Sequence, residues 1–237
     1  RFALFERYTL PSIKAQTNQN FEWLVMFYKG TPEKFKQKIA DFQGQMKNFI
    51  PLYIDDNVEP SKVLNTYFHK YNMLYCVTTR VDNDDSVHID FVNTIQEYIC
   101  GRKLERYALG FQNGIQYDDR VHMASRYKFP NNHFTTLISS MTTHIDTIFD
   151  FNHMEIIQHV HFENIVQDKA MWLEVVHGTN LANRMHTKIQ DIIKNPQELA
   201  VFSCNVSWSK WEMVKNSCYA LFIGPINVLS LFRGYGP

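Results

Sequence analysis

Continuous apolar runs alternate with striped or polar stretches over the first hundred residues of the chain. The runs at 21–28, 49–54 and 73–81 predict buried β-strands, and the stretches at 31–48, 61–70 and 87–100 predict helices. A loose helical stripe from Phe2 to Leu10 precedes them, with Pro11 near its end and a further helical piece reaching Gln16. Thr31 is expected to cap the next helix, with Pro32 as its first residue. This alternation predicts an α/β fold whose central, mostly parallel sheet is flanked by helices.

The pattern changes after residue 105. Short strands are predicted at 106–111, 114–117 and 122–128, with Asn113-Gly114 as a hairpin turn. Helices are predicted at 134–141 and 168–177, the second with a buried stripe of Ala170, Leu173 and Val176. No linker or repeat interrupts the sequence. We therefore expect one domain, 1–237, with an α/β first half and a mixed second half.

Composition excludes several classes of protein. Among 237 residues, 24 Lys and Arg balance 24 Asp and Glu, which argues against a general nucleic-acid binder. The four cysteines form no C-x-x-C pair, so a zinc ribbon or a disulfide scaffold is not expected, and a reducing, cytoplasmic location is favoured. The apolar stretch 218–232 is too short to span a bilayer and contains Pro225, although a peripheral contact with a membrane stays open.

An acidic run, Asp82-Asn83-Asp84-Asp85, directly follows the apolar strand 73–81. Ligands of open α/β sheets bind at the carboxyl ends of strands. Three neighbouring carboxylates repel one another unless a cation offsets their charge. Mg²⁺ or Mn²⁺, which also hold substrate phosphates, would suit this place. The alternative is a solvated turn in which Asp84 or Asp85 caps the next helix.

This run resembles the D-x-D motif of GT-A glycosyltransferases. More narrowly, three blocks resemble the rhamnosyltransferase family of bacterial and viral polysaccharide enzymes, and the resemblance spans about residues 1–185. The blocks are Arg1–Ser12 with Gln16-Thr17 and Phe21-x-Trp23; Thr79–Asp85; and Trp172-Leu173-x-Val175-x-His177-Gly178-x-Asn180. The resemblance implies a GT-A fold, a divalent metal and a nucleotide-sugar donor (UDP-, GDP- or dTDP-linked). Residues 1–105 would then be the nucleotide-sugar half and 106–237 the acceptor half, in a chain whose first GT-A strand would lie before Arg1, as in one domain of a longer polypeptide.

The resemblance also suggests roles for individual residues. Asp84, Asp85 and His177 would hold the metal. Asp82, Asn83, Arg80, Asn180 and Arg184 would contact the donor. Asp168, in the first turn of the predicted helix, would be the base that deprotonates the acceptor hydroxyl, with Glu174 as a weaker alternative. Each has a structural alternative: Asp168 capping the helix, His177 a structural histidine, Arg184 a surface side chain, and Arg80 neutralising the acidic run.

The middle of the chain is open to two interpretations. Tyr117, Asp118 and Asp119 would contact a sugar, or they would merely follow a hairpin. The run Asn131-Asn132-His133 would contact the acceptor or cap a helix.

The function predicted is a metal-dependent, inverting hexosyltransferase that moves a sugar, with rhamnose as the family label, onto a glycan in polysaccharide biosynthesis. The alternatives are a nucleotidyltransferase and a non-catalytic module that binds nucleotide sugars or glycans. Motifs for P-loop and serine-hydrolase chemistry are absent from the sequence.

Overall fold

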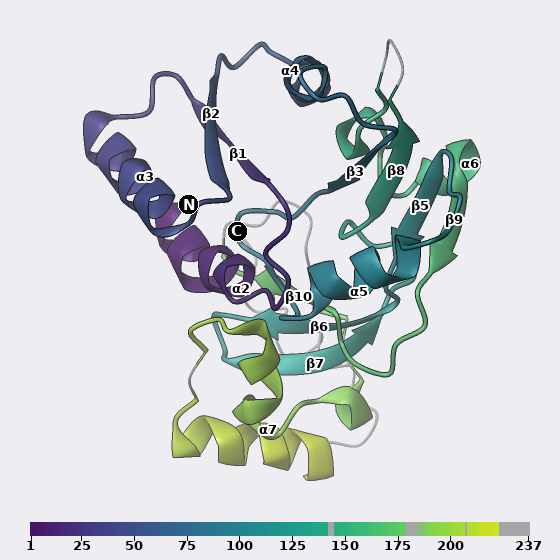
Figure 1. The fold of residues 1–237 in the computed structure, drawn as a ribbon. Coiled ribbons are helices and arrows are strands. Elements are labelled where there is room, and N and C mark those ends of the chain that lie inside the picture. Colours follow the sequence, from purple (N-terminus) through teal and green to yellow (C-terminus); the bar gives the residue numbers. More distant parts are fainter. Residues whose placement is uncertain (142–144, 179–184, 187, 207, 223–237) are drawn as a thin grey trace.

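A computed structural model describes residues 1–141, 145–178, 185–186, 188–206 and 208–222 (Figure 1). Helices and strands alternate through the first hundred residues, as predicted, and the chain has an α/β fold. In order, the elements are α1 (Phe2–Leu4), η1 (Phe5–Thr9), α2 (Leu10–Lys14), β1 (Trp23–Tyr28), α3 (Glu33–Gln45), β2 (Phe49–Ile54), α4 (Pro60–Phe68), β3 (Tyr75–Thr79), β4 (Ser86–Val87), α5 (Phe91–Ile99), β5 (Tyr107–Gly110), β6 (Asn113–Asp118), β7 (Met123–Lys128), β8 (Thr136–Ser140), η2 (Ile148–Asp150), α6 (Ile156–His159), β9 (His161–Asn164), β10 (Trp172–Val176), η3 (Ile189–Asp191), η4 (Pro196–Phe202) and α7 (Lys210–Phe222).

The strands form three sheets, ordered β1-β2, β4-β10-β6-β7 and β3-β8-β5-β9 in the described part of the chain. The prediction of a mostly parallel sheet is wrong. The pairs β1–β2, β10–β6 and β5–β9 are parallel, but β10–β4, β3–β8, β5–β8 and β6–β7 are antiparallel. The reason is that β4 is a short return strand after the acidic run, and that the second half adds a hairpin and the antiparallel strand β8.

The elements α1, η1 and α2 follow one another without a break and are called the N-terminal helix here. This helix packs against the body of the fold (Figure 1). Its middle section, η1, is a π-helix, which α2 continues with Pro11 in its first turn. Proline has no N–H to donate, but Pro11 comes just after a π-helical turn, where the regular i→i−4 bonding is already interrupted. The helix therefore continues past Pro11. The predicted cap of α3 is wrong: Pro32 has extended backbone and is itself the N-cap, and the Thr31 hydroxyl bonds to the Tyr28 carbonyl.

Two predicted helices are strands. Residues 134–141 contain β8, which lies between β3 and β5 and whose Thr and Ile side chains favour extended backbone. Residues 168–177 contain β10, which lies between β4 and β6 and is buried at every residue. A strand covered on both faces shows no alternation, so its apolar spacing resembled a helical stripe.

The predicted hairpin turn at Asn113-Gly114 is also wrong, because both residues begin β6. Gly114 pairs with Trp172 of β10, and the indole of Trp172 occupies the space where a side chain at Gly114 would lie. The indole N–H donates to the Phe111 carbonyl at 2.7 Å. Glycine is therefore present at this position for close packing.

We expect Gly114→Ala to lower the free energy of unfolding by about 3 kcal/mol, because a methyl group here overpacks against a buried ring. The control is Gly44→Ala on α3, where an added Cβ meets nothing within 4 Å. Alanine should stabilise that helix by up to ~1 kcal/mol. Urea titrations measure both, and equal effects of the two substitutions would refute the packing argument.

Two apolar clusters cover the sheet that contains β10. The larger joins the N-terminal helix, α3 and α5 through Phe5, Phe49, Phe91 and Trp172. The second packs Tyr8 and Tyr117 against η4 on the opposite side. Among the helices of the described residues, none is long and apolar enough to cross a membrane.

Candidate metal and donor site

The acidic loop, defined here as residues 80–85, joins β3 to β4. It is held from one side by the N-terminal helix. The Thr9 hydroxyl donates to the Asp82 carbonyl at 3.3 Å, and the Ser86 hydroxyl donates to the Tyr8 carbonyl at 2.8 Å. The loop turns back on itself through a bond from the Asp85 N–H to the Asp82 carbonyl. Its carboxylates are thus fixed beside β10 instead of extending into solvent.

Asp85 is the most buried carboxylate of the loop. One of its oxygens accepts the Val175 N–H at 2.8 Å, and the other lies 2.8 Å from Nε2 of His133. Burial raises the pKa of Asp85 to about 6, against the lowering effects of His133 and of the Val175 N–H. Burial lowers the pKa of His133, but the hydrogen bond and charge of Asp85 outweigh it, so this pKa is raised overall. Asp85 and His133 thus form an electrostatically coupled, hydrogen-bonded pair.

Asp84 makes a second pair with a histidine. Nε2 of His177 lies 2.8 Å from Oδ2 of Asp84, and both residues are buried. The Arg1 guanidinium reaches the same oxygen at 3.5 Å. Oδ1 of Asp84 has no partner within the described part of the chain. His177 directly follows β10, so the pair lies at the carboxyl end of a strand, where the acidic run was expected to find its ligand.

Asp82 lies at the exposed side of the loop. Its carboxylate forms two hydrogen bonds with Arg80, at 2.8 and 3.3 Å. Of the two roles open to Arg80, the structure shows the neutralising one. Asn83 lies 3.5 Å from Arg1 through its side-chain oxygen.

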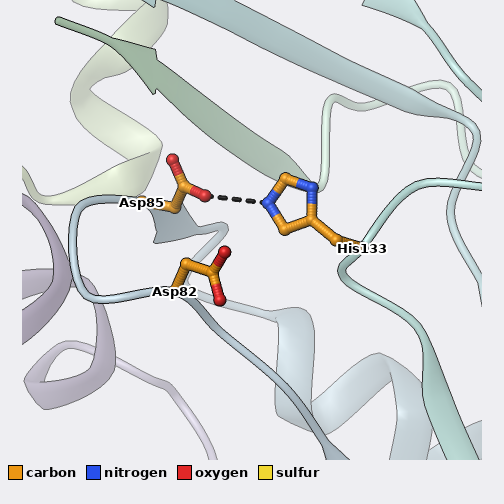
Figure 2. Close-up of side chains that lie close together, drawn as sticks. All are labelled: Asp82, Asp85 and His133. Atoms are coloured by element: carbon orange, nitrogen blue, oxygen red, sulfur yellow. Dashed lines mark hydrogen bonds and ion pairs between the residues drawn. The ribbon is translucent and has the colours of Figure 1, made fainter. Parts of the chain in front are cut away.

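Asp82, Asp85 and His133 offer ligand atoms that all lie within 4.8 Å of one another (Figure 2). The two carboxylates come from the acidic loop, and the imidazole comes from the segment before β8. Two carboxylates and an imidazole form a donor set that a divalent transition ion accepts. The prediction placed Asp84, Asp85 and His177 together and did not include His133 among the ligands.

Asp119 directly follows β6 and lies beside the end of β10. Its N–H donates to the Val176 carbonyl at 2.9 Å, one residue before His177. Oδ1 of Asp119 accepts the Tyr8 hydroxyl at 2.6 Å and pairs with Arg7 at 2.9 Å. Oδ2 has no partner in the part of the chain that the structure describes. The carboxylate is thus anchored by one oxygen and free at the other.

Tyr8 can act only as a donor in this contact. Burial, followed by the hydrogen bond and charge of Asp119, raises its pKa far above the ordinary value. The neighbouring Asp118 is occupied differently, because its carboxylate holds Arg120 at 2.6 Å and 3.0 Å.

Asp168 does not lie in a helix, which is a correction to the prediction. It is exposed in a bend before β10, because residues 168–177 form a strand and no helix dipole acts there. Its neighbour Lys169 pairs with Asp90, near the start of β10. The acidic loop, in contrast, contacts β10 near its end, where Asp85 accepts the Val175 N–H. Asp168 and His177 are thus at opposite ends of β10, whose five residues extend over about 16 Å.

Glu174, the alternative base, is buried within β10 and accepts a hydrogen bond from Gln116 at 2.5 Å. Asn132 is a buried loop residue that donates to the Phe111 and Phe129 carbonyls. It caps no helix. Asn180 and Arg184, predicted to contact the donor, lie outside the described residues.

A comparison with family models decides the family of this chain. Residues 1–189 match the model described as "Putative rhamnosyl transferase". The chain belongs to this family. A comparison with curated proteins gave no match.

The rhamnosyl transferase match includes the whole site described above. The N-terminal helix, the acidic loop, Asp119, His133 and His177 all lie within residues 1–189. Helix α7 lies beyond them. The description names glycosyl transfer as the chemistry of the family.

Proposed function

We propose that this protein is a metal-dependent, inverting glycosyltransferase that moves a sugar from a nucleotide-sugar donor to a glycan hydroxyl. One observation carries the proposal. Two carboxylate–imidazole pairs, Asp84–His177 and Asp85–His133, meet at one acidic loop in a chain of the rhamnosyl transferase family. A merely structural acidic turn would not need a histidine partner from a distant segment for each of two carboxylates.

The residues of the loop fit a divalent ion. Oδ1 of Asp84 accepts no hydrogen bond from the described residues, and His177 contacts its Oδ2. Asp82, in the same loop, offers a carboxylate oxygen within 4.8 Å of the ligand atoms of Asp85 and His133. Asp85 has both oxygens occupied, so it supports the proposal as a residue that holds the loop and His133 in place. Mixed carboxylate and imidazole ligands favour Mn²⁺ over Mg²⁺, which prefers oxygen alone. When bound, the ion would stabilise the charge of the leaving diphosphate.

Donor recognition is proposed for the polar groups around this loop. Asn83 and Arg1 lie at its open side and could reach the donor phosphates, because Arg1 is only weakly engaged, at 3.5 Å. Asp82 would face the ribose, with Arg80 holding its orientation. Asn180 and Arg184 remain part of this proposal.

Asp119 is better placed than Asp168 to act as the base. Its free Oδ2 would take the proton of the acceptor hydroxyl while the acceptor oxygen bonds to the anomeric carbon. The bond from that carbon to the diphosphate oxygen breaks at the same time, and the nucleoside diphosphate leaves with the electron pair. Inversion follows, because attack and departure occur on opposite faces of the sugar.

The test is incubation of the protein with UDP-, GDP- and dTDP-sugars, a rhamnose donor among them, in Mn²⁺. Slow donor hydrolysis makes the test independent of the acceptor. Release of a nucleoside diphosphate from one donor class is expected. Release of pyrophosphate would instead identify a nucleotidyltransferase, and binding without any turnover would identify a binding module.

A further inference from the structure

Helix α7 has two different faces, and one of them is fixed to the body of the protein. Lys215 donates to the Val121 carbonyl at 2.8 Å, and Asn216 donates to the His122 carbonyl at 3.1 Å. Glu212 pairs with His122 at 3.4 Å. These contacts attach α7 to the turn between β6 and β7, below which it lies in Figure 1. The opposite face is therefore turned away from the sheet.

That outer face is apolar and exposed. Trp211 is 74% exposed, Val214 is 50% exposed and Met213 is 36% exposed. Met213 and Val214 line a shallow groove of about 470 Å³, together with Lys194, Lys210, Ser217 and Cys218. Isolated exposed apolar residues are common on proteins, but Trp211 and Val214, three positions apart, are neighbours on the helix surface. Adjacent exposed apolar side chains are typical of an interaction site.

The charges around the groove are of one sign. Lys194 and Lys210 line it, and none of the described residues that line it carries a carboxylate. The sequence that follows α7, residues 223–237, is mainly apolar and has a single charged side chain, Arg233. An apolar face with an aromatic residue and a lysine border is the composition of helices that lie in the interface of anionic bilayers.

We propose that the outer face of α7 docks on the surface of an anionic lipid bilayer. Trp211, Val214 and Met213 would enter the headgroup region, and Lys194 and Lys210 would contact lipid phosphates. The inner face of α7 holds the turn that follows Asp119, the proposed base for the acceptor hydroxyl. Docking would therefore place the acceptor end of the site near the lipid surface. The proposal does not depend on the enzymatic activity.

The test is sedimentation of the full chain with vesicles of neutral phosphatidylcholine and of phosphatidylcholine mixed with phosphatidylglycerol. We expect binding to the mixed vesicles and little to the neutral ones. Trp211→Ser with Val214→Ser should weaken binding about tenfold or more. Lys194→Gln with Lys210→Gln should weaken it by about 25-fold, because each lysine near an anionic surface contributes about fivefold.

The matched control removes exposed apolar side chains elsewhere. Leu74 and Val166 are 81% and 87% exposed, and Leu74→Ser with Val166→Ser should bind as the wild type does. Equal loss in this control, equal binding to neutral vesicles, or no binding at all would overturn the proposal. So would a wild-type dimer in sedimentation velocity that the Trp211 and Val214 changes dissociate, because a second copy would then cover the face.

Discussion

Replacing Asp84 by asparagine is expected to lower donor turnover about 10³-fold, because the leaving diphosphate then lacks its stabilising cation. Asparagine keeps the shape of the side chain but removes the charge that a divalent ion requires. The hydrogen bond between Asp84 and His177 makes the residue part of a buried pair, so both partners serve one site. Turnover is measured as release of nucleoside diphosphate at saturating donor and Mn²⁺.

The control for this substitution is Asp56→Asn. Asp56 is an exposed aspartate between β2 and α4, away from the acidic loop. The Asp56→Asn variant should retain wild-type turnover. If Asp84→Asn kept turnover within about threefold of the wild type while folding normally, the loop would not hold a catalytic cation.

Replacing Asp119 by asparagine is expected to lower turnover by about 10²–10⁴-fold with donor affinity nearly unchanged, because a general base acts in the chemical step. Its anchored Oδ1 and free Oδ2 suit proton transfer from a hydroxyl at a fixed position. Measurement of kcat beside a nucleotide dissociation constant separates the chemical step from binding.

Two substitutions accompany this test. Asp168→Asn should behave as the wild type, because Asp168 lies at the far end of β10. Tyr8→Phe removes one of the two donors that hold Asp119 and should lower kcat about tenfold, leaving donor binding intact. A large loss in Asp168→Asn with none in Asp119→Asn would return the role of base to Asp168.

The first half of the fold could be predicted because its elements follow simple periods. Strand β3 is followed at once by charged residues that cannot continue it, and α5 shows a clear apolar stripe. The second half could not be predicted as well, because β10 is buried on both faces between neighbours from distant parts of the chain. Its helical interpretation also led to the choice of Asp168 as the base.

Only those parts of the site that are close together in the sequence could be predicted. The acidic run stands out because it follows a strand, and His177 was recognised through the family-like block around it. His133 gives no such signal, since its partner Asp85 is 48 positions away. Tyr8 and Asp119 are 111 positions apart, and only packing of the N-terminal helix on the sheet brings them together.

The most direct test of the central claim is calorimetric binding of UDP, GDP and dTDP to the wild-type chain, each with and without Mn²⁺. The account predicts that one of the three nucleotides binds only when Mn²⁺ is present, because the acidic loop repels a bare diphosphate. Binding of equal strength in the absence of any divalent cation would contradict the assignment of the acidic loop as a metal-dependent donor site.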